Sequence, residues 1–204
     1  MPPVVLIPVN SFGRAKGRLS ELYTPELRAQ LAITTFTTVA TAVRDAGLLS
    51  VALTPEPDAV RALGAASEVI GESPRLHGLN AQLEGLVTQL GDEVLVLHAD
   101  LPLATGVALI GFLEAAGQAE TALVRSSDGG TNAMLLRPPG RFPLAYGANS
   151  FTAHDTAARA AGLSVVHVES PALALDLDTP ADIELLLSTA EGRATLAGQL
   201  LSAR

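Results

Sequence analysis

The sequence predicts an α/β protein in which helices cover both faces of a mixed, mostly parallel sheet, giving three layers. Short apolar segments alternate with helical segments of ten or more residues, as in βαβ units with parallel strands. A glycine-rich turn, DGGT at 128–131, directly joins two strand-like segments and therefore adds an antiparallel ribbon. The 204 residues have one composition throughout and contain no visible linker or repeat, which favours a single domain over 1–204.

Local signals place the elements of the first half. The apolar run VVLIPV at 4–9 is short and predicts a buried strand. A helix begins at Thr24, a good N-cap followed by Pro25 at the first helical position, and Gly47 suits the residue after its end. The remaining elements expected in this half are a strand at 49–54, a helix at 57–63, a strand at 68–70, a helix at 78–91 and a strand at 93–98.

The second half continues the alternation. Its expected elements are a helix at 104–117, strands at 121–127 and 132–138, a helix at 150–162 and a strand at 164–168. Leucine alternates with aspartate in ALALDLD at 172–178, which predicts another strand. A helix over 179–188 follows, and a last helix at 191–202 is expected to pack on the exterior.

Composition excludes several classes of function. The net charge of −8 lacks the positive footprint of a nucleic-acid-binding protein. The absence of cysteine excludes disulfides, zinc–thiolate sites, iron–sulfur clusters and cysteine nucleophiles. No apolar run approaches the roughly 20 residues of a membrane helix, and no positive charge precedes the first apolar stretch as in a secretory signal. We therefore expect a soluble, cytoplasmic protein without membrane contact.

Three aspartates stand where strands of the predicted sheet end. Asp100 closes VLVLHAD, and Asp176 and Asp178 close ALALDLD, where strand alternation would put both on one face. Ligands of open α/β sheets bind at the carboxyl ends of the strands. Three carboxylates gathered there would form an oxygen-ligand site for Mg²⁺ and would repel one another without a cation.

Each aspartate also has a plain structural interpretation. Asp178 precedes Thr179 and Pro180, so by itself it is better explained as part of a helix start. Asp100 precedes Leu-Pro and would suit a turn equally well. Asp176 is harder to explain this way, because a strand between leucines gains nothing from a buried carboxylate. The three together favour a metal site.

A cluster of cations follows the first strand. The chain has 13 Lys and Arg residues but a single lysine, Lys16, which Arg14 and Arg18 flank in NSFGRAKGRLS. The loop is either a solvated surface loop or, in a protein this acidic, a local anion site at the place where nucleotide-binding folds hold phosphates. It matches neither the GxxxxGK[ST] nor the GxGxxG pattern, which disfavours a P-loop NTPase and a Rossmann dehydrogenase.

Three further polar positions admit two interpretations each. The segment DGGTN at 128–132 is a hairpin turn or a small polar site. Asn149 and Ser150 either cap the following helix or belong to an anion site at its N-terminus, one turn before His154, which we expect on the surface or in a supporting role. Asn80 either caps its helix or contacts a nucleobase or ribose.

Taken together, the motifs resemble a known family. In the family's order, the chain carries IPVNSFGRAKGRLS, HADLPL, DGGTNAMLLRPP, YGANSFTAHDTAARAAG and LDLDTPADIELL. These blocks resemble the 2-phospholactate or phosphoenolpyruvate guanylyltransferases, which act in the biosynthesis of a deazaflavin coenzyme in archaea and actinobacteria. The resemblance spans nearly the whole chain and implies the nucleotidyltransferase fold, similar to that of the nucleotide-diphospho-sugar transferases. DGGTNA and LDLDTPADI are its most specific blocks.

The resemblance also implies roles for individual residues. Asp100, Asp176 and Asp178 match the family's Mg²⁺-binding aspartates and, with Lys16, would be its catalytic residues. The matching nucleotide contacts are Arg14, Lys16 and Arg18 at the phosphates and Asn80 near the nucleoside. The matching acceptor contacts are Asn10, Thr131, Gly147 and Ser150. The implied partners are GTP and a three-carbon phosphoacid, with a downstream transferase and a homodimer as further candidates.

One departure from the family pattern bears on the acceptor. Asn10 stands where the family usually has a lysine that helps to hold the anionic acceptor, and an amide supplies hydrogen bonds but no charge. Two alternatives therefore stay open. One is a related nucleotidyltransferase with another base or acceptor, although the LxGGxxxR loop usual in such enzymes is absent. The other is a non-catalytic nucleotide-binding regulator, which would have less need of three aspartates.

Overall fold

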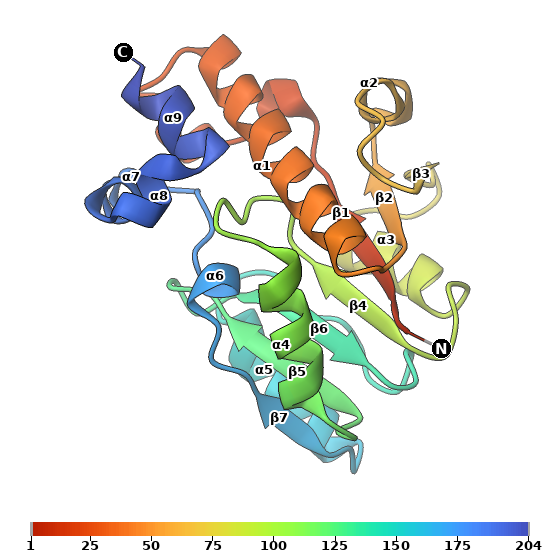
Figure 1. The fold of residues 1–204 in the computed structure, drawn as a ribbon. Coiled ribbons are helices and arrows are strands. Elements are labelled where there is room, and N and C mark those ends of the chain that lie inside the picture. Colours follow the sequence, from red (N-terminus) through yellow and green to blue (C-terminus); the bar gives the residue numbers. More distant parts are fainter. Residues whose placement is uncertain (1, 204) are drawn as a thin grey trace.

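The computed structural model describes residues 2–203 and confirms the predicted α/β class (Figure 1). Within these residues one sheet holds seven strands in the order β3-β2-β1-β4-β6-β5-β7. The strands are β1 Val4–Pro8, β2 Ser50–Thr54, β3 Glu68–Gly71, β4 Val94–Leu97, β5 Thr121–Arg125, β6 Thr131–Leu136 and β7 Val165–His167. All pairs are parallel except those of β6, which runs antiparallel to β4 and to β5. The turn between β5 and β6 thus creates the expected antiparallel ribbon.

The helices lie where the sequence periodicity predicts them, with one addition, α6, and a division at the C-terminus. They are α1 Pro25–Asp45, α2 Pro57–Ala62, α3 Leu79–Val87, α4 Gly106–Ala116, α5 Ser150–Ala160, α6 Pro171–Ala174, α7 Pro180–Ser188, α8 Ala190–Ala194 and α9 Leu196–Ser202. Two short 3₁₀ turns, η1 Phe12–Arg14 and η2 Gly17–Leu19, form the basic loop after β1. Thr24 caps α1 as expected, because its side chain accepts a hydrogen bond from the Leu27 amide.

Apolar residues fill the space on both sides of the sheet. On one face, Ile7 and Leu97 pack with Phe36 of α1 and Phe112 of α4 in a continuous cluster. On the opposite face, β-strand residues such as Leu6 pack against α3 and α5. Figure 1 shows α1 and α4 in front of the sheet and α3 and α5 behind it. The domain therefore has the three layers that the alternation of strands and helices predicts. No helix in 2–203 combines the length and apolarity needed to cross a membrane.

The C-terminal segment differs from the single helix expected at 191–202. It forms α8 and α9, because Thr195 adopts an extended backbone between them and its hydroxyl accepts from the Gly198 amide as the N-cap of α9. Ala197 and Leu201 are buried in a third apolar cluster together with Leu27 of α1. In Figure 1 this part of the chain lies beside the N-terminal half of α1.

The prediction of a strand at 172–178 is wrong. The first part forms α6, and the stretch from Leu175 to Asp178 is not part of the sheet. Leu175, Asp176 and Leu177 are all buried, so the stretch shows no strand-like alternation of exposure. Both edges of β4 are already paired, with β1 and with β6, so no edge there is free for another strand. The segment instead passes the end of β4, where the Leu177 amide donates to the Asp100 carbonyl oxygen at 3.1 Å.

Candidate active site

A cleft of about 770 Å³ opens at the carboxyl ends of the central strands. Segments that follow β1, β3 and β4 contribute most of its lining, as the topology of an open parallel sheet predicts. Its polar lining residues are Asn10, Arg14, Lys16, Arg18, Thr35, Glu72, His98, Asp100 and Asp178. The cleft therefore brings the basic loop and two of the three predicted aspartates to one place.

The three predicted metal ligands converge beside this cleft. Carboxylate oxygens of Asp100, Asp176 and Asp178 all lie within 4.8 Å of one another. Asp100 follows β4, and the other two come from the segment that crosses the end of that strand. The sequence predicts this convergence, and it correctly places Asp100 after the end of a strand. The alternation expected to put Asp176 and Asp178 on one face of a strand is wrong, because 175–178 is not a strand.

Within residues 2–203, the cluster places three carboxylates beside a single ammonium group, that of Lys16. Burial, followed by the negative charge of Asp100, raises the pKa of Asp176 to about 6. Burial also opposes ionisation of Asp100, but the Lys16 ammonium outweighs it and holds the pKa of Asp100 below its usual value. Asp100 Oδ1 is buried and has no hydrogen-bond partner among the described residues. An oxygen of this kind, next to two more carboxylates, suits a cation.

Lys16 points into the carboxylate cluster. Its Nζ donates to Asp100 Oδ2 at 2.9 Å and to Asp178 Oδ1 at 3.2 Å, and only 4% of its side chain is exposed. Burial opposes the charge, but Asp100 and Asp178 outweigh it and raise the pKa of Lys16. The residue has φ 57°, a left-handed conformation that costs a non-glycine residue roughly 1–2 kcal/mol. The turn between η1 and η2 thus holds its backbone in a conformation that lysine rarely adopts.

The other two cations of the basic loop, Arg14 and Arg18, are exposed. Arg14 and Arg18 line the cleft, and Arg18 Nη1 lies 4.0 Å from Asp128 Oδ2 in the turn between β5 and β6. Asn10 is also exposed, and its Oδ1 accepts from the Ser11 amide at 2.8 Å. The Asn10 NH₂ group therefore remains available as a donor toward the cleft.

Two of the predicted acceptor residues form a second, buried group. Ser150 Oγ donates to Thr131 Oγ1 at 3.2 Å, and both residues are at most 2% exposed. Gly147 lies in the exposed loop before α5, with φ 141°, and its carbonyl oxygen accepts from the Ser150 amide. None of these three residues is part of the lining of the cleft given above.

Two residues that the sequence did not assign to the site, Asn132 and His154, organise this region. Asn132 is buried, and its Nδ2 donates to the Ala174 carbonyl oxygen at 3.0 Å and to Asp176 Oδ1 at 3.3 Å. Since neighbours on a strand point to opposite faces, β6 joins Thr131 on one side to the carboxylate cluster on the other. His154, expected on the surface or in a supporting role, is completely buried and contacts Thr131. Alternation along β6 was the signal that could have identified Asn132.

Asn80 is held by the loop before α5. Its Nδ2 donates to the Tyr146 carbonyl oxygen at 3.1 Å, and its Oδ1 accepts from the Tyr146 amide at 2.7 Å. Gly78 rather than Asn80 occupies the N-cap position of α3. The expected contact with the nucleoside stays a prediction, for which one Nδ2 hydrogen remains free.

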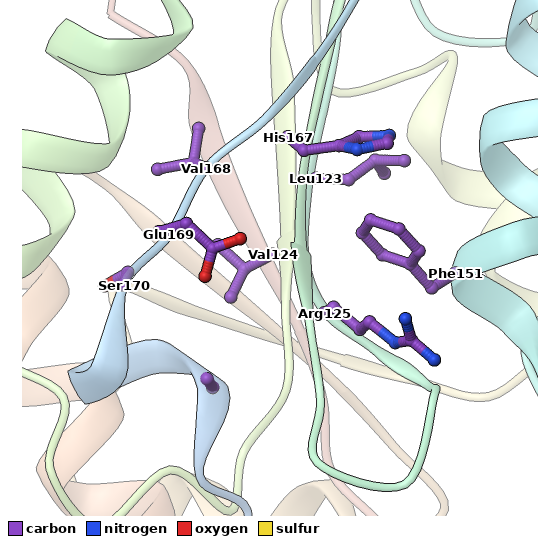
Figure 2. A pocket seen from close by; sticks show the side chains of 9 residues that line it. Leu123, Val124, Arg125, Phe151, His167, Val168, Glu169 and Ser170 are labelled. Atoms are coloured by element: carbon purple, nitrogen blue, oxygen red, sulfur yellow. The ribbon is translucent and has the colours of Figure 1, made fainter.

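A second, smaller cavity of about 170 Å³ lies where the chain leaves β7 (Figure 2). Figure 2 shows Arg125, Phe151 and His167 on one side of the strand pair and Glu169 on the other. Arg125 lies over the Phe151 ring at 5.6 Å, and His167 Nε2 is 2.7 Å from Asp155 Oδ1. Because its charged groups do not converge, the larger cleft is the candidate active site.

The chain is similar to known proteins over nearly its whole length. A family model described as "Guanylyl transferase CofC like" matches residues 3–198. The phosphoenolpyruvate guanylyltransferase of Rubrobacter xylanophilus is 38% identical over 196 residues, covering 91% of this chain and 94% of that protein. The 2-phospho-L-lactate guanylyltransferase of Methanoregula boonei is 34% identical over 193 residues, covering 95% and 86%.

Solved structures agree on the fold. A crystal structure from Desulfovibrio desulfuricans G20, ascribed to a nucleotide-diphospho-sugar transferase, superposes with a TM-score of 0.81. The match covers 98% of this chain and 94% of that chain, at 16% sequence identity. At this identity the likeness supports the architecture alone, and it confirms the nucleotide-diphospho-sugar transferase-like fold that the sequence predicts.

Proposed function

The chain belongs to the family of CofC-like guanylyl transferases, and on that premise we propose that it transfers GMP from GTP to a three-carbon phosphoacid. The acceptor would be phosphoenolpyruvate or 2-phospho-L-lactate, pyrophosphate would leave, and the product would serve deazaflavin coenzyme biosynthesis. The observation that carries the proposal is the cluster of Asp100, Asp176 and Asp178 beside a cleft that three cationic side chains line. Such a site suits a reaction between two anions.

The carboxylate cluster fits Mg²⁺. Mg²⁺ prefers oxygen ligands, and the cluster offers three carboxylates, one of which has a buried oxygen without a hydrogen-bond partner in residues 2–203. Asp100, Asp176 and Asp178 would hold the ion. Bound there, it would supply charge neutralisation for the phosphate oxygens around the reacting phosphorus.

The chain's own residues would hold the two substrates together. An oxygen of the acceptor phosphate forms a bond to the α-phosphorus of GTP, and the bond from that phosphorus to the β-phosphate oxygen breaks. The acceptor phosphate is already anionic, so no protein base has to remove a proton. Lys16, Arg14 and Arg18 would bind the triphosphate and stabilise the pyrophosphate as it leaves.

The acceptor would lie toward the loop before α5. The backbone amides from Gly147 to Asn149 have no hydrogen-bond acceptor among residues 2–203, and they precede the N-terminus of an 11-residue helix. Free amides at a helix N-terminus favour phosphate or carboxylate. Thr131 and Ser150 add hydroxyl groups beside them, and Asn10 would donate from its amide in place of the family's lysine.

The proposed reaction predicts a defined product pattern. Purified protein with Mg²⁺ is expected to release pyrophosphate from GTP with phosphoenolpyruvate or one enantiomer of 2-phospholactate, and mass spectrometry should find the matching guanylylated acid. ATP and CTP are tested as alternative nucleotide donors and 3-phosphoglycerate as an alternative acceptor. Excess EDTA should stop the reaction. Product from CTP or ATP instead would show that the protein is a related nucleotidyltransferase with another base preference. GTP binding without turnover with any acceptor would show that it is a non-catalytic nucleotide-binding regulator.

The cleft also predicts how guanine is recognised. Glu72 follows β3 and lines the cleft, and among residues 2–203 its carboxylate has no hydrogen-bond or ion-pair partner. Guanine presents two adjacent donors, N1–H and the 2-amino group, which one carboxylate can accept together. Glu72→Gln is therefore expected to lower kcat/KM for GTP by roughly 10- to 100-fold, the value of a charged hydrogen bond.

A matched variant and an analogue make this test specific. Glu68 is an exposed glutamate at the start of β3, outside the cleft lining, and Glu68→Gln should leave kcat/KM unchanged. Inosine triphosphate lacks the 2-amino group. The substitution Glu72→Gln should therefore lower kcat/KM less with inosine triphosphate than with GTP. Equal kinetics of the two glutamine variants with GTP would contradict the assignment of Glu72.

A further inference from the structure

His154 is a fully buried histidine whose two ring nitrogens both have hydrogen-bond partners. Nε2 lies 2.9 Å from the backbone amide of Ala145, and Nδ1 lies 3.0 Å from Thr131 Oγ1. A backbone N–H only donates, so Nε2 must be the unprotonated nitrogen of a neutral ring. The ring proton therefore sits on Nδ1 and is donated to Thr131 Oγ1.

The surroundings of His154 keep this form in place. Burial, and then the nearby His98, lower the pKa of His154 to about 4, so the ring is neutral at physiological pH. The Tyr146 ring packs edge-on against it with centroids 4.7 Å apart, and the Phe142 ring lies 6.5 Å from it. The hydrogen bonds at the two ring nitrogens fix the orientation of the ring and the position of its proton.

This arrangement defines what the Thr131 hydroxyl can do. Its oxygen accepts one hydrogen bond from His154 Nδ1 and a second from Ser150 Oγ. A hydroxyl oxygen has two lone pairs and one proton, so both acceptor positions are used. Only the Thr131 hydrogen remains for a further partner, and that partner has to be an acceptor.

We propose that His154 is a positioning residue that makes Thr131 an obligate donor toward the phosphoacid. The pocket would then favour an oxygen that only accepts, such as an ionised phosphate or carboxylate oxygen, over a hydroxyl that must also donate. His154 acts through Thr131 and does not itself touch substrate. The inference rests on the proposed function, since it requires Thr131 to face the acceptor.

Two substitutions separate the two hydrogen bonds of His154. The amide nitrogen of asparagine occupies nearly the position of Nδ1, so His154→Asn keeps a donor to Thr131 and loses the acceptor for Ala145. Glutamine reaches the position of Nε2, so His154→Gln keeps the acceptor for Ala145 and loses the donor to Thr131. Both variants replace the buried imidazole ring with a side-chain amide, so both change the packing at the same site. Thermal unfolding would establish that each variant is folded.

The expected result is a change in acceptor binding alone. His154→Gln should raise KM for the phosphoacid by roughly 10-fold, the value of one buried hydrogen bond, with kcat and the KM for GTP within about threefold of the wild type. His154→Asn should stay within about threefold in all three parameters. Equal losses in both variants, or a loss in kcat or GTP binding, would overturn the proposal in favour of a structural role.

Three further measurements separate this proposal from the proposed function. In a Thr131→Val background, His154→Gln should add less than a twofold effect, because the hydroxyl it orients is gone. Long-range ¹H–¹⁵N NMR of the wild type should show His154 as the Nδ1–H tautomer without any turnover, and the Nε2–H tautomer would refute the inference. Lack of turnover by the wild type would refute the proposed function. In that case, calorimetric binding of phosphoenolpyruvate to the wild type and to the His154 variants would test the role of His154. If the wild-type protein does not bind phosphoenolpyruvate, the proposed role of His154 is overturned as well.

Discussion

Asp178→Asn is expected to lower kcat/KM for GMP transfer by roughly 10²- to 10³-fold, with little change in thermal stability. The substitution removes one charge from the three-carboxylate cluster and thereby weakens the site for Mg²⁺. The Asp178 side chain is 40% exposed, so the folded state tolerates an isosteric amide there. Pyrophosphate release measured across a Mg²⁺ titration checks the result, and the variant should need more Mg²⁺ for half-maximal rate.

An acidic residue remote from the cleft supplies the control. Asp58 on α2 has a side chain that is almost entirely exposed, and Asp58→Asn should retain wild-type kinetics and the same Mg²⁺ requirement. Retained turnover by Asp178→Asn at low Mg²⁺ would contradict the assignment of the cluster to metal binding. Loss of activity together with unfolding would point to a structural carboxylate instead.

Among the substitutions considered, Lys16→Met is expected to lower the free energy of unfolding most. Its effect on the rate of GMP transfer is expected to be comparable to that of Asp178→Asn. Methionine replaces the aliphatic part of the Lys16 side chain and keeps its backbone strain, but it leaves Asp100 and Asp178 without their ammonium partner. Removing one member of a buried ion pair costs roughly 3–5 kcal/mol of unfolding free energy, and the partial exposure of Asp100 and Asp178 puts this case at the lower end. We also expect a loss of roughly 10²-fold in kcat/KM, because the same group is proposed to bind the triphosphate.

Mg²⁺ should restore part of the stability that Lys16→Met loses. A cation that binds only the folded protein stabilises it by mass action, and in the variant no ammonium competes for the two carboxylates. Urea unfolding with EDTA and with millimolar Mg²⁺ should therefore show a larger Mg²⁺-dependent gain in the variant than in the wild type. Arg14→Met, at an exposed position of the same loop, should show the wild-type gain. Equal gains in all three proteins would argue against a shared site for Lys16 and the metal.

Elements with a strong local signal were predicted well. Thr24 and Pro25 begin α1 as expected. Thr179 begins α7, where it forms a reciprocal capping box with Asp182. The turn at 128–131 produces the antiparallel ribbon. In these cases a few neighbouring residues set the backbone through capping, turn chemistry and hydrophobic periodicity, so the rest of the chain has little influence.

Two segments depend on distant partners, and the sequence either mispredicted them or left them open. Leucine–aspartate alternation at 172–178 resembles a strand, but both edges of β4 are occupied and the segment crosses its end instead. For His154 the sequence left a surface position and a supporting role open, and its burial between the loop at Ala145 and the start of β6 agrees with the supporting role. Neither result follows from the residues near the segment in sequence.

Local residue patterns were enough to predict the fold class, the basic loop after the first strand and the types of residue in the site. Three contacts emerge only in the folded chain: Lys16 points between Asp100 and Asp178, Asn132 bonds to Asp176, and His154 donates to Thr131. These contacts join residues from 23 to 162 positions apart in the chain. Local propensity cannot specify these contacts, because they arise only when the β-sheet and the two helical layers bring separate segments together. Once the segments are buried, each polar group also needs a hydrogen-bond partner.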